Sequence, residues 1–279
     1  MKNDTMSLKA KINNYAKACS IRPQAVLQTL MFERFLERLS RSPYRDHFVI
    51  KGGALISVIL GVALRTTMDL DATLMSYPLT EESVLRAIQE ICEMPLEDEV
   101  TFSDFAASPI RRNDPNGGLR IRFNAHFKSM VTPLSMDVSL GDEITPAPIL
   151  HEWHGLLDEK VNIALLCYNV ETILAEKVEA ILSLGEFTTR PRDFYDVHAL
   201  VNKRAYKRDL FNQALTSTAT HRGTLERIKE YTSTLERIAQ SADIRARWNS
   251  YAREYPYAHE ISLENTLETV RGLMAGWTP

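Results

Sequence analysis

Thr67-Met-Asp-Leu-Asp-Ala-Thr-Leu74 is the stretch from which the fold of this chain is best argued. Its polar and apolar residues alternate, and this period of two predicts a β-strand. Residues two apart on a strand point to the same face, so Asp69 and Asp71 place their carboxylates together, roughly 7 Å apart along the chain. Such a pair repels unless a cation lies between them, and carboxylate oxygens with substrate phosphates suit magnesium. Two solvated acids on an edge strand explain the pattern equally well.

The residues before this stretch predict a strand, a glycine turn and a helix. His47-Phe-Val-Ile50 is a short apolar run, Lys51, Gly52 and Gly53 close it, and residues 54–64 suit a packed helix. Glycines at such a turn let a phosphate approach the backbone, and a helix N-terminus favours anions. A tight turn without any ligand is the simpler interpretation of the glycines taken alone. Neither a P-loop nor a dinucleotide-binding fingerprint is present.

Two residues just ahead of the acidic pair are further candidates for contact with a nucleotide. Arg65 is placed to hold a triphosphate or, alternatively, a neighbouring carboxylate. Thr67 follows it at the start of the predicted strand and is counted with the nucleotide-binding candidates.

A third acid, Asp137, lies on another predicted strand. Residues 135–140 alternate, with Met136 and Val138 on one face and Asp137 on the other. If this strand neighbours the first acidic strand, three carboxylates converge, and such a site can hold two divalent ions for phosphoryl transfer. If it does not, Asp137 is a solvated strand acid. The alternation over residues 119–128 predicts a further strand with one buried and one basic face.

The second half of the chain has the periodicity of helices. An amphipathic helix is expected over residues 170–184, ending at Gly185. Further helices are expected near residues 193–204, 206–218, 224–240, 241–253 and 263–275. We therefore expect an α+β protein in which a mixed-sheet core with N-terminal helices (residues 1–165) is followed by a helical domain (residues 166–279).

Composition excludes several classes of protein. The chain has 279 residues, 44% hydrophobic and 25% charged, which is an ordinary globular mixture. Its longest apolar runs are too short to span a membrane, and its start lacks an apolar signal core, so a cytoplasmic protein is expected. Three scattered cysteines indicate neither a disulfide framework nor a zinc site. The net charge of −3 argues against a general nucleic-acid coat but leaves room for a local basic surface.

Basic residues do gather in places. Residues 186–253 hold 13 Lys and Arg against 8 Asp and Glu. A second basic group comprises Arg111, Arg112, Arg120, Arg122 and Lys128. If both groups flank the acids, they form a groove for a polyanion, and the alternative is a solvated helix face. The aromatic residues of the C-terminal part either stack on unpaired bases or anchor a core, and the core is favoured: Trp248, Tyr251, Tyr255 and Tyr257.

Five segments in a fixed order resemble the AbiEii/AbiGii toxin family, which includes the MenT toxins. They are Lys51–Ser57, Arg65–Asp71, Met136–Val138, Ala175–Ala180 and Arg190–Leu200. Each motif alone is weak, whereas the ordered set, which spans about residues 25 to 205, is fairly specific. Members of this family are nucleotidyltransferases of the DNA polymerase β-like superfamily, so the resemblance implies a small mixed-sheet core with an appended helical domain.

The resemblance also implies roles for individual residues. Asp69 and Asp71 match the metal-binding pair, and Asp137 matches a third acid that serves as a metal ligand or as a base. Lys177 matches a helix lysine that contacts nucleotide phosphates, and Asp193 matches a late acid of the active site. Arg192 and Val197 depart mildly from the family pattern, which has lysine and leucine there.

We therefore expect a Mg2+-dependent nucleotidyltransferase toxin of a bacterial toxin–antitoxin or phage-defence pair. It would transfer a nucleotide from a nucleoside triphosphate to RNA, with the tRNA 3′ end as the acceptor that the resemblance favours. The cognate antitoxin is a separate chain that need not bind the toxin directly. The alternatives are a nucleotide- or RNA-binding protein that acts without catalysis, and transfer to a protein hydroxyl.

Overall fold

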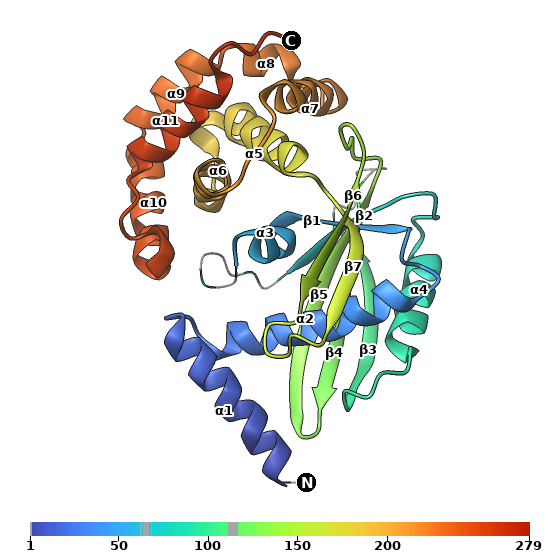
Figure 1. The fold of residues 1–279 in the computed structure, drawn as a ribbon. Coiled ribbons are helices and arrows are strands. Elements are labelled where there is room, and N and C mark those ends of the chain that lie inside the picture. Colours follow the sequence, from blue (N-terminus) through green and yellow to red (C-terminus); the bar gives the residue numbers. More distant parts are fainter. Residues whose placement is uncertain (1, 62, 64–66, 68, 111–116) are drawn as a thin grey trace. The chain divides into compact units, whose positions relative to one another are not determined.

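The computed structural model describes residues 2–61, 63, 67, 69–110 and 117–279, with the side chains from residue 7 onward (Figure 1). By its internal contacts the chain divides into two compact units. Unit 1 comprises residues 1–141 and 149–167, and unit 2 comprises residues 142–148 and 168–279. Residues 142–148 therefore belong to unit 2, although the chain returns to unit 1 for residues 149–167. The expected division into residues 1–165 and 166–279 stays a prediction.

Unit 1 is built on a seven-stranded mixed sheet with the strand order β3-β4-β5-β2-β1-β7-β6. Two of its internal pairings are parallel, β2 with β5 and β1 with β7, and the other four are antiparallel. The strands are β1 (Phe48–Lys51), β2 (Leu70–Leu74), β3 (Val100–Pro109), β4 (Leu119–Phe127), β5 (Met130–Leu140), β6 (Ile149–His154) and β7 (Asn162–Cys167).

The helices of unit 1 are α1 (Lys2–Ala18), α2 (Pro23–Arg41), α3 (Gly52–Leu60) and α4 (Glu81–Glu93). Helices α2 and α4 pack against one face of the sheet, where Phe35 of α2 meets Phe123 of β4 at a ring-centroid distance of 5.4 Å. The alternating burial of β4 and β5 explains why one face is chosen: Ile121, Phe123 and Met136 are buried, whereas the residues between them are more exposed. The more polar face of these strands is therefore turned away from α2.

Some expected elements differ from the structure in their extent. The helix after the glycine turn runs over Gly52–Leu60 and ends there because Gly61 adopts a left-handed φ of 92°. Strand β2 begins at Leu70, so Asp71 lies on the strand whereas Asp69 immediately precedes it. The single helix expected over residues 224–240 is two helices, because the first ends at Lys229 and the second begins at Tyr231.

Unit 2 is helical and is organised around α5 (Val170–Leu184), which contacts α6, α7, α8 and α9. The other helices are α6 (Pro191–Lys203), α7 (Arg208–His221), α8 (Leu225–Lys229), α9 (Tyr231–Gln240), α10 (Ala242–Glu254) and α11 (Leu263–Met274), with short 3₁₀ turns at Gly185–Phe187 and Pro256–Ala258.

Residues 142–148 join unit 2 through hydrogen bonds to the start of α5. The side-chain amide of Asn169 donates to the carbonyls of Thr145 (2.9 Å) and Ala147 (3.2 Å), and its oxygen accepts from the N–H of Thr172 as the N-cap of α5. Thr172 and Thr145 exchange two further bonds, in which each residue donates once to the other. One cap residue therefore both starts α5 and fastens a remote loop to it.

The expected α+β class is confirmed: a mixed sheet occupies the N-terminal half and helices fill the C-terminal part. No helix in the described part of the chain is both long and apolar enough to cross a membrane.

A buried ion pair ties α2 to the start of β3. The guanidinium of Arg38 holds both carboxylate oxygens of Asp98 at 2.6 and 2.8 Å and also donates to the carbonyl of Val100. The side chains of Arg38 and Asp98 are only 3% and 10% exposed, so water cannot replace either partner. Arg86 and Glu82 form a solvent-exposed ion pair for comparison, since their side chains are 61% and 84% exposed.

Arg38→Met is expected to lower the free energy of unfolding by about 3–5 kcal/mol, because it leaves the Asp98 carboxylate with little solvent and no cation. The control Arg86→Met, which breaks the exposed pair, is expected to change it by less than about 1 kcal/mol. Urea unfolding followed by circular dichroism measures both. Equal losses in the two variants would contradict the structural role of the Arg38 pair.

Candidate active site

Four charged residues form a row across four neighbouring strands of the sheet in unit 1. In the strand register, Lys51 of β1 is paired with Asp71 of β2, Asp71 with Asp137 of β5, and Asp137 with Arg120 of β4. Residues paired in this way share one face of the sheet. The row runs Arg120, Asp137, Asp71, Lys51, and it lies on the face turned away from α2. The register thus brings the second and third expected acids side by side.

The carboxylate of Asp71 lies against the backbone of Gly52, at the first residue of α3. A Cβ atom built on Gly52 would lie 2.1 Å from Oδ2 and 2.7 Å from Cγ of Asp71. Gly52 also has a left-handed φ of 64°, a backbone conformation that residues other than glycine rarely adopt. Glycine is therefore required at position 52 for two reasons, and the close approach places the Asp71 carboxylate next to the N-terminus of α3.

Asp69 is exposed, and its backbone is held by Thr67. The hydroxyl of Thr67 donates to the carbonyl of Asp69 at 3.2 Å and accepts from its N–H at 3.4 Å. Thr67 is expected to contact the nucleotide; in this structure its hydroxyl holds the backbone of Asp69. Arg65 lies outside the described residues.

Lys51 reaches along the same face of the sheet. Its ammonium donates to the hydroxyl of Ser139 on β5 at 2.8 Å, although β2 lies between their strands. Ser139 also lies 3.1 Å from the hydroxyl of Thr73 on β2. The ammonium of Lys51 therefore extends over β2, the strand that carries Asp71. Gly53, the other glycine of the turn, is buried in α3, and its carbonyl accepts from Ser57 at 3.0 Å.

Arg120 is the site residue that the sequence analysis missed, because it was counted only as part of a basic surface. Its Nε and Nη2 donate to the two oxygens of Asp137 at 2.7 and 2.6 Å. The hydrogen bonds and charge of Asp137 raise the pKa of Arg120 further above its usual value, and the charges of Asp69 and Asp71 add to this. The alternation of β4 predicts that Arg120 lies on the polar face of the sheet. Only the strand register shows that its partner is Asp137.

A divalent ion fits this site only in part. The close approach of Gly52 gives the Asp71 carboxylate a fixed place, and exposed Asp69 stands two residues earlier. Within the described residues, however, no group of three or more His, Cys, Asp or Glu side chains is arranged to hold an ion. The donor set therefore fits an ion held by one or two carboxylates and completed by phosphates, which is the usual habit of Mg2+.

Unit 2 contains a second, buried charge cluster at the expected positions of Lys177 and Asp193. The ammonium of Lys177 lies 2.5 Å from Asp193 and 3.0 Å from Asp196, and Arg190 holds the other oxygen of Asp193 at 2.8 Å. The side chains of Asp193 and Asp196 are 5% and 0% exposed, and that of Lys177 is 12% exposed. Two acids and two bases balance each other here, so Lys177 has a structural duty besides any contact with a ligand.

Some basic residues of the expected basic surface form ion pairs with acidic residues of their own unit. Arg222 pairs with Glu176 and Glu179, and Lys128 pairs with Glu99. Arg111 and Arg112 lie outside the described residues.

The C-terminal aromatic residues pack together as core anchors. Trp248 and Tyr251 are 2% and 6% exposed, and the ring of Tyr257 lies 4.7 Å from that of Tyr195. The interpretation of these rings as a packed cluster is the one that their burial supports.

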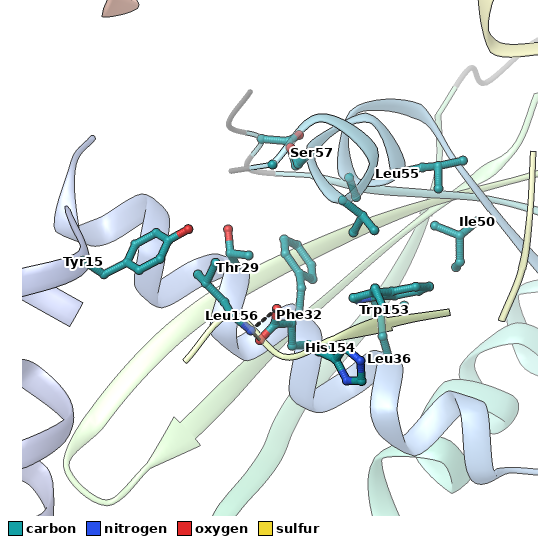
Figure 2. Close-up of a pocket in the computed structure, with 15 residues that line it drawn as sticks. Tyr15, Thr29, Phe32, Leu36, Ile50, Leu55, Ser57, Trp153, His154 and Leu156 are labelled. Atoms are coloured by element: carbon teal, nitrogen blue, oxygen red, sulfur yellow. Dashed lines mark hydrogen bonds between the residues drawn. The ribbon is translucent and has the colours of Figure 1, made fainter. Parts of the chain in front are cut away.

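A cavity of about 170 Å3 lies on the side of unit 1 to which Ile50 points (Figure 2). Ile50 precedes Lys51 on β1, so it points to the sheet face opposite the charged row. Figure 2 shows Tyr15, Thr29, Phe32 and Trp153 around this space, which is mostly apolar. Its charged lining residue, Glu33, is buried, and both carboxylate oxygens accept from the N–H of Leu156 at 2.9 and 3.0 Å. Burial raises the pKa of Glu33 from 4.5 to about 7.

Comparison with solved structures shows that two proteins from Helicobacter pylori share this fold. A protein from H. pylori assigned to the nucleotidyltransferases superposes with a TM-score of 0.52 at 17% sequence identity, over 91% of this chain and 95% of the other. The protein JHP933 from Helicobacter pylori gives a TM-score of 0.53 at 16% identity, over 91% of each chain. At these identities the likeness concerns the fold alone.

The family follows from the sequence itself. Residues 34–269 match the model of the family described as the nucleotidyl transferase AbiEii toxin of type IV toxin–antitoxin systems, and the chain belongs to this family. It is therefore a nucleotidyltransferase toxin, and the family implies a nucleoside triphosphate substrate and a cognate antitoxin. No curated protein matches the chain.

Gly52→Ala is expected to lose about 1–2 kcal/mol of stability from the left-handed φ and about 1–3 kcal/mol more from the collision with Asp71. Gly223 is a matched control, because its φ of 65° is nearly the same and a Cβ there would meet nothing within 4 Å. Gly223→Ala is expected to show the first loss only. Urea unfolding of both variants measures the difference, and equal losses would show that Asp71 does not crowd position 52.

Glu33→Gln is expected to remove a pH dependence of stability. Because the pKa of Glu33 is about 7 in the folded chain and near 4.5 when unfolded, the unfolded state loses its proton first. Stability contributed by the protonated form is therefore full below pH 4.5 and falls as the pH rises to 7, by about 3 kcal/mol in total. Urea unfolding at pH 5 and pH 8 measures this. The variant is expected to lack that fall, and the exposed-site control Glu81→Gln to retain it.

Proposed function

We propose that this toxin transfers a nucleoside monophosphate from a nucleoside triphosphate to the 3′-terminal hydroxyl of an RNA, and that tRNA in the cytoplasm is its acceptor. The observation that carries the proposal is the pairing of Asp71 with Asp137 on neighbouring parallel strands, with the Asp71 carboxylate against Gly52 at the start of α3. Membership of the AbiEii family supports the reaction class, and the acceptor rests on the resemblance of the motifs.

In the reaction, the acceptor oxygen forms a bond to the α-phosphorus of the triphosphate. The bond from that phosphorus to the bridging oxygen of the β-phosphate breaks, pyrophosphate leaves with the electron pair, and the hydroxyl proton passes to solvent or to a carboxylate. When bound, Mg2+ neutralises the charge that develops on the phosphate oxygens. Asp69 and Asp71 are the residues that would hold it, in keeping with the preference of Mg2+ for one or two carboxylates.

The other expected residues have supporting roles in this proposal. The backbone of Gly52 and Gly53 at the start of α3 and the ammonium of Lys51 favour the negative phosphates, because a helix N-terminus and a cation both attract anions. Arg65 and Lys177 are proposed as further phosphate contacts, and Asp193 as the acid that orients Lys177, which it contacts at 2.5 Å. Asp137 can act as a base for the hydroxyl only if its pair with Arg120 opens.

Two other functions remain as outcomes of the test. A binding protein without catalysis would retain nucleotide or RNA and release no pyrophosphate. Transfer to a protein hydroxyl would use the same donor and the same acids with a different acceptor.

The test is incubation with total tRNA, Mg2+ and each α-labelled nucleoside triphosphate in turn. The wild type is expected to label tRNA with one nucleotide, and Asp69→Asn is expected to reduce labelling at least about 100-fold, since one preorganised electrostatic group contributes on the order of 10²–10³ in rate. Asp69 suits this test because it is exposed, so its loss does not unfold the chain. Lys177 does not, because its removal takes away the cation that both buried acids, Asp193 and Asp196, contact.

Asp46→Asn is the matched control, because Asp46 is another exposed aspartate of unit 1 outside the site, and it is expected to leave labelling unchanged. Label in a protein acceptor instead of tRNA would support the second alternative. Retained nucleotide without any label transfer would support the first and would contradict the proposed chemistry.

A further inference from the structure

We propose that Arg120 is a built-in cation of the acidic site, so that the site takes one divalent ion, beside Asp69 and Asp71, and not two. The inference rests on the proposed function, because it concerns the metal ion of that reaction. It assigns Asp137 to Arg120 and removes it from the set of metal ligands. Arg120 is then a positioning residue, which holds the Asp137 carboxylate away from a metal ion and places its own charge beside the acids.

The first support is the geometry of the Arg120 pair. Both oxygens of Asp137 accept from one guanidinium, at 2.7 and 2.6 Å, in the fork that arginine forms with a carboxylate. Both residues lie on the middle strands of the sheet, in direct register, so backbone pairing holds them together. A second divalent ion would have to compete with this fork for the same two oxygens.

The second support is the order of charges along the row. Two like charges directly opposite each other on paired strands destabilise a sheet, and Asp71 is paired with Asp137. The chain places Arg120 on the outer side of Asp137 and Lys51 on the outer side of Asp71. Each acid of the row thus has a basic neighbour in register. Asp69 adds one negative charge beyond this balance, next to Asp71.

The third support is the reach of the Arg120 charge. All three acids, Asp69, Asp71 and Asp137, raise the pKa of Arg120, so its guanidinium stands within the field of the whole acidic group. A cation already in that field lowers the affinity of the group for a second one. Consistent with this, the described residues contain no cluster of three acids arranged around one point.

The chemical consequence concerns Asp137. Both oxygens of Asp137 are held by the guanidinium of Arg120 in charge-assisted hydrogen bonds. Asp137 therefore fixes Arg120 beside Asp71, and neither of its oxygens is offered to a second ion. The positive charge of Arg120 remains available at the site, since 39% of its side chain is exposed.

Counting bound Mn2+, as a spectroscopic substitute for Mg2+, tests the inference. Electron paramagnetic resonance of free Mn2+ gives the number of ions bound per chain in the presence of millimolar Mn2+ alone. The wild type is expected to bind one ion, and Arg120→Gln is expected to bind two, because Asp137 becomes free to ligate. The double variant Arg120→Gln with Asp137→Asn is expected to return to one.

Arg122→Gln is the matched control. Arg122 lies two residues further along the same strand and the same face, is paired in register with Ser135, and is expected to leave the count at one. If Arg120→Gln does not fold, Asp137→Asn in the presence of native Arg120 serves instead: it is expected to keep one ion, whereas Asp69→Asn is expected to lose it. Two ions or none in the wild type would overturn the inference, as would a count of one in a folded Arg120→Gln.

Crystals soaked in Mn2+ locate the ion independently of activity. One anomalous peak beside Asp69 and Asp71, with the Arg120 fork closed, is the expected result. The label-transfer assay on the same preparation keeps the two proposals apart. Label transfer with two bound ions overturns the role of Arg120 alone, whereas one bound ion without label transfer overturns the proposed reaction alone.

Discussion

The parallel pairing of β2 with β5 is the constraint on which the site depends. It sets Asp71 directly beside Asp137, and the two like charges would push these strands apart if nothing compensated them. The compensation comes from the strands on either side, through Arg120 of β4 and Lys51 of β1. The strand order β4-β5-β2-β1 is therefore also an order of charges, and the same residues that stabilise the sheet give the site its electrostatic character.

The two units treat their charges in different ways. In unit 2, Lys177 and Arg190 neutralise two buried acids, so that cluster resembles a structural core in which each member depends on the others. In unit 1, Asp69 is exposed immediately before β2, where a ligand can reach it. Substitutions in the two groups therefore carry different information: changes in unit 2 report mainly on folding, and a change at Asp69 reports on chemistry.

Much of this arrangement could be predicted from the sequence, and the reason is local patterning. The alternation around Asp71 and the glycine at the end of α5 are each encoded within a few residues, and the structure has them. The mixed-sheet and helical halves follow from the same patterns. The partner of Asp137 could not be predicted, because Arg120 meets it through strand register, a property of the assembled sheet and not of any one segment.

The ends of elements were harder to place for a similar reason. Asp69 was expected on the strand because it continues the alternation, but β2 begins at Leu70 and Thr67 instead braces the backbone of Asp69. The helix after the glycine turn was expected to reach Leu64 from its apolar content, whereas the left-handed φ of Gly61 ends it at Leu60. In both cases a backbone conformation decided the boundary, and hydrophobic periodicity does not report on it.

Because residues 142–148 belong to unit 2, the chain cannot be divided between the two units by a single cut. Because the amide of Asn169 fastens this loop through Thr145 and Ala147, the polypeptide passes between the units three times, at residues 141–142, 148–149 and 167–168. A truncation after Cys167 would delete α5 and leave the loop between β5 and β6 without its hydrogen-bond partners. The loop thus belongs with the helical part, and an exchange of that part between relatives would have to carry the loop with it.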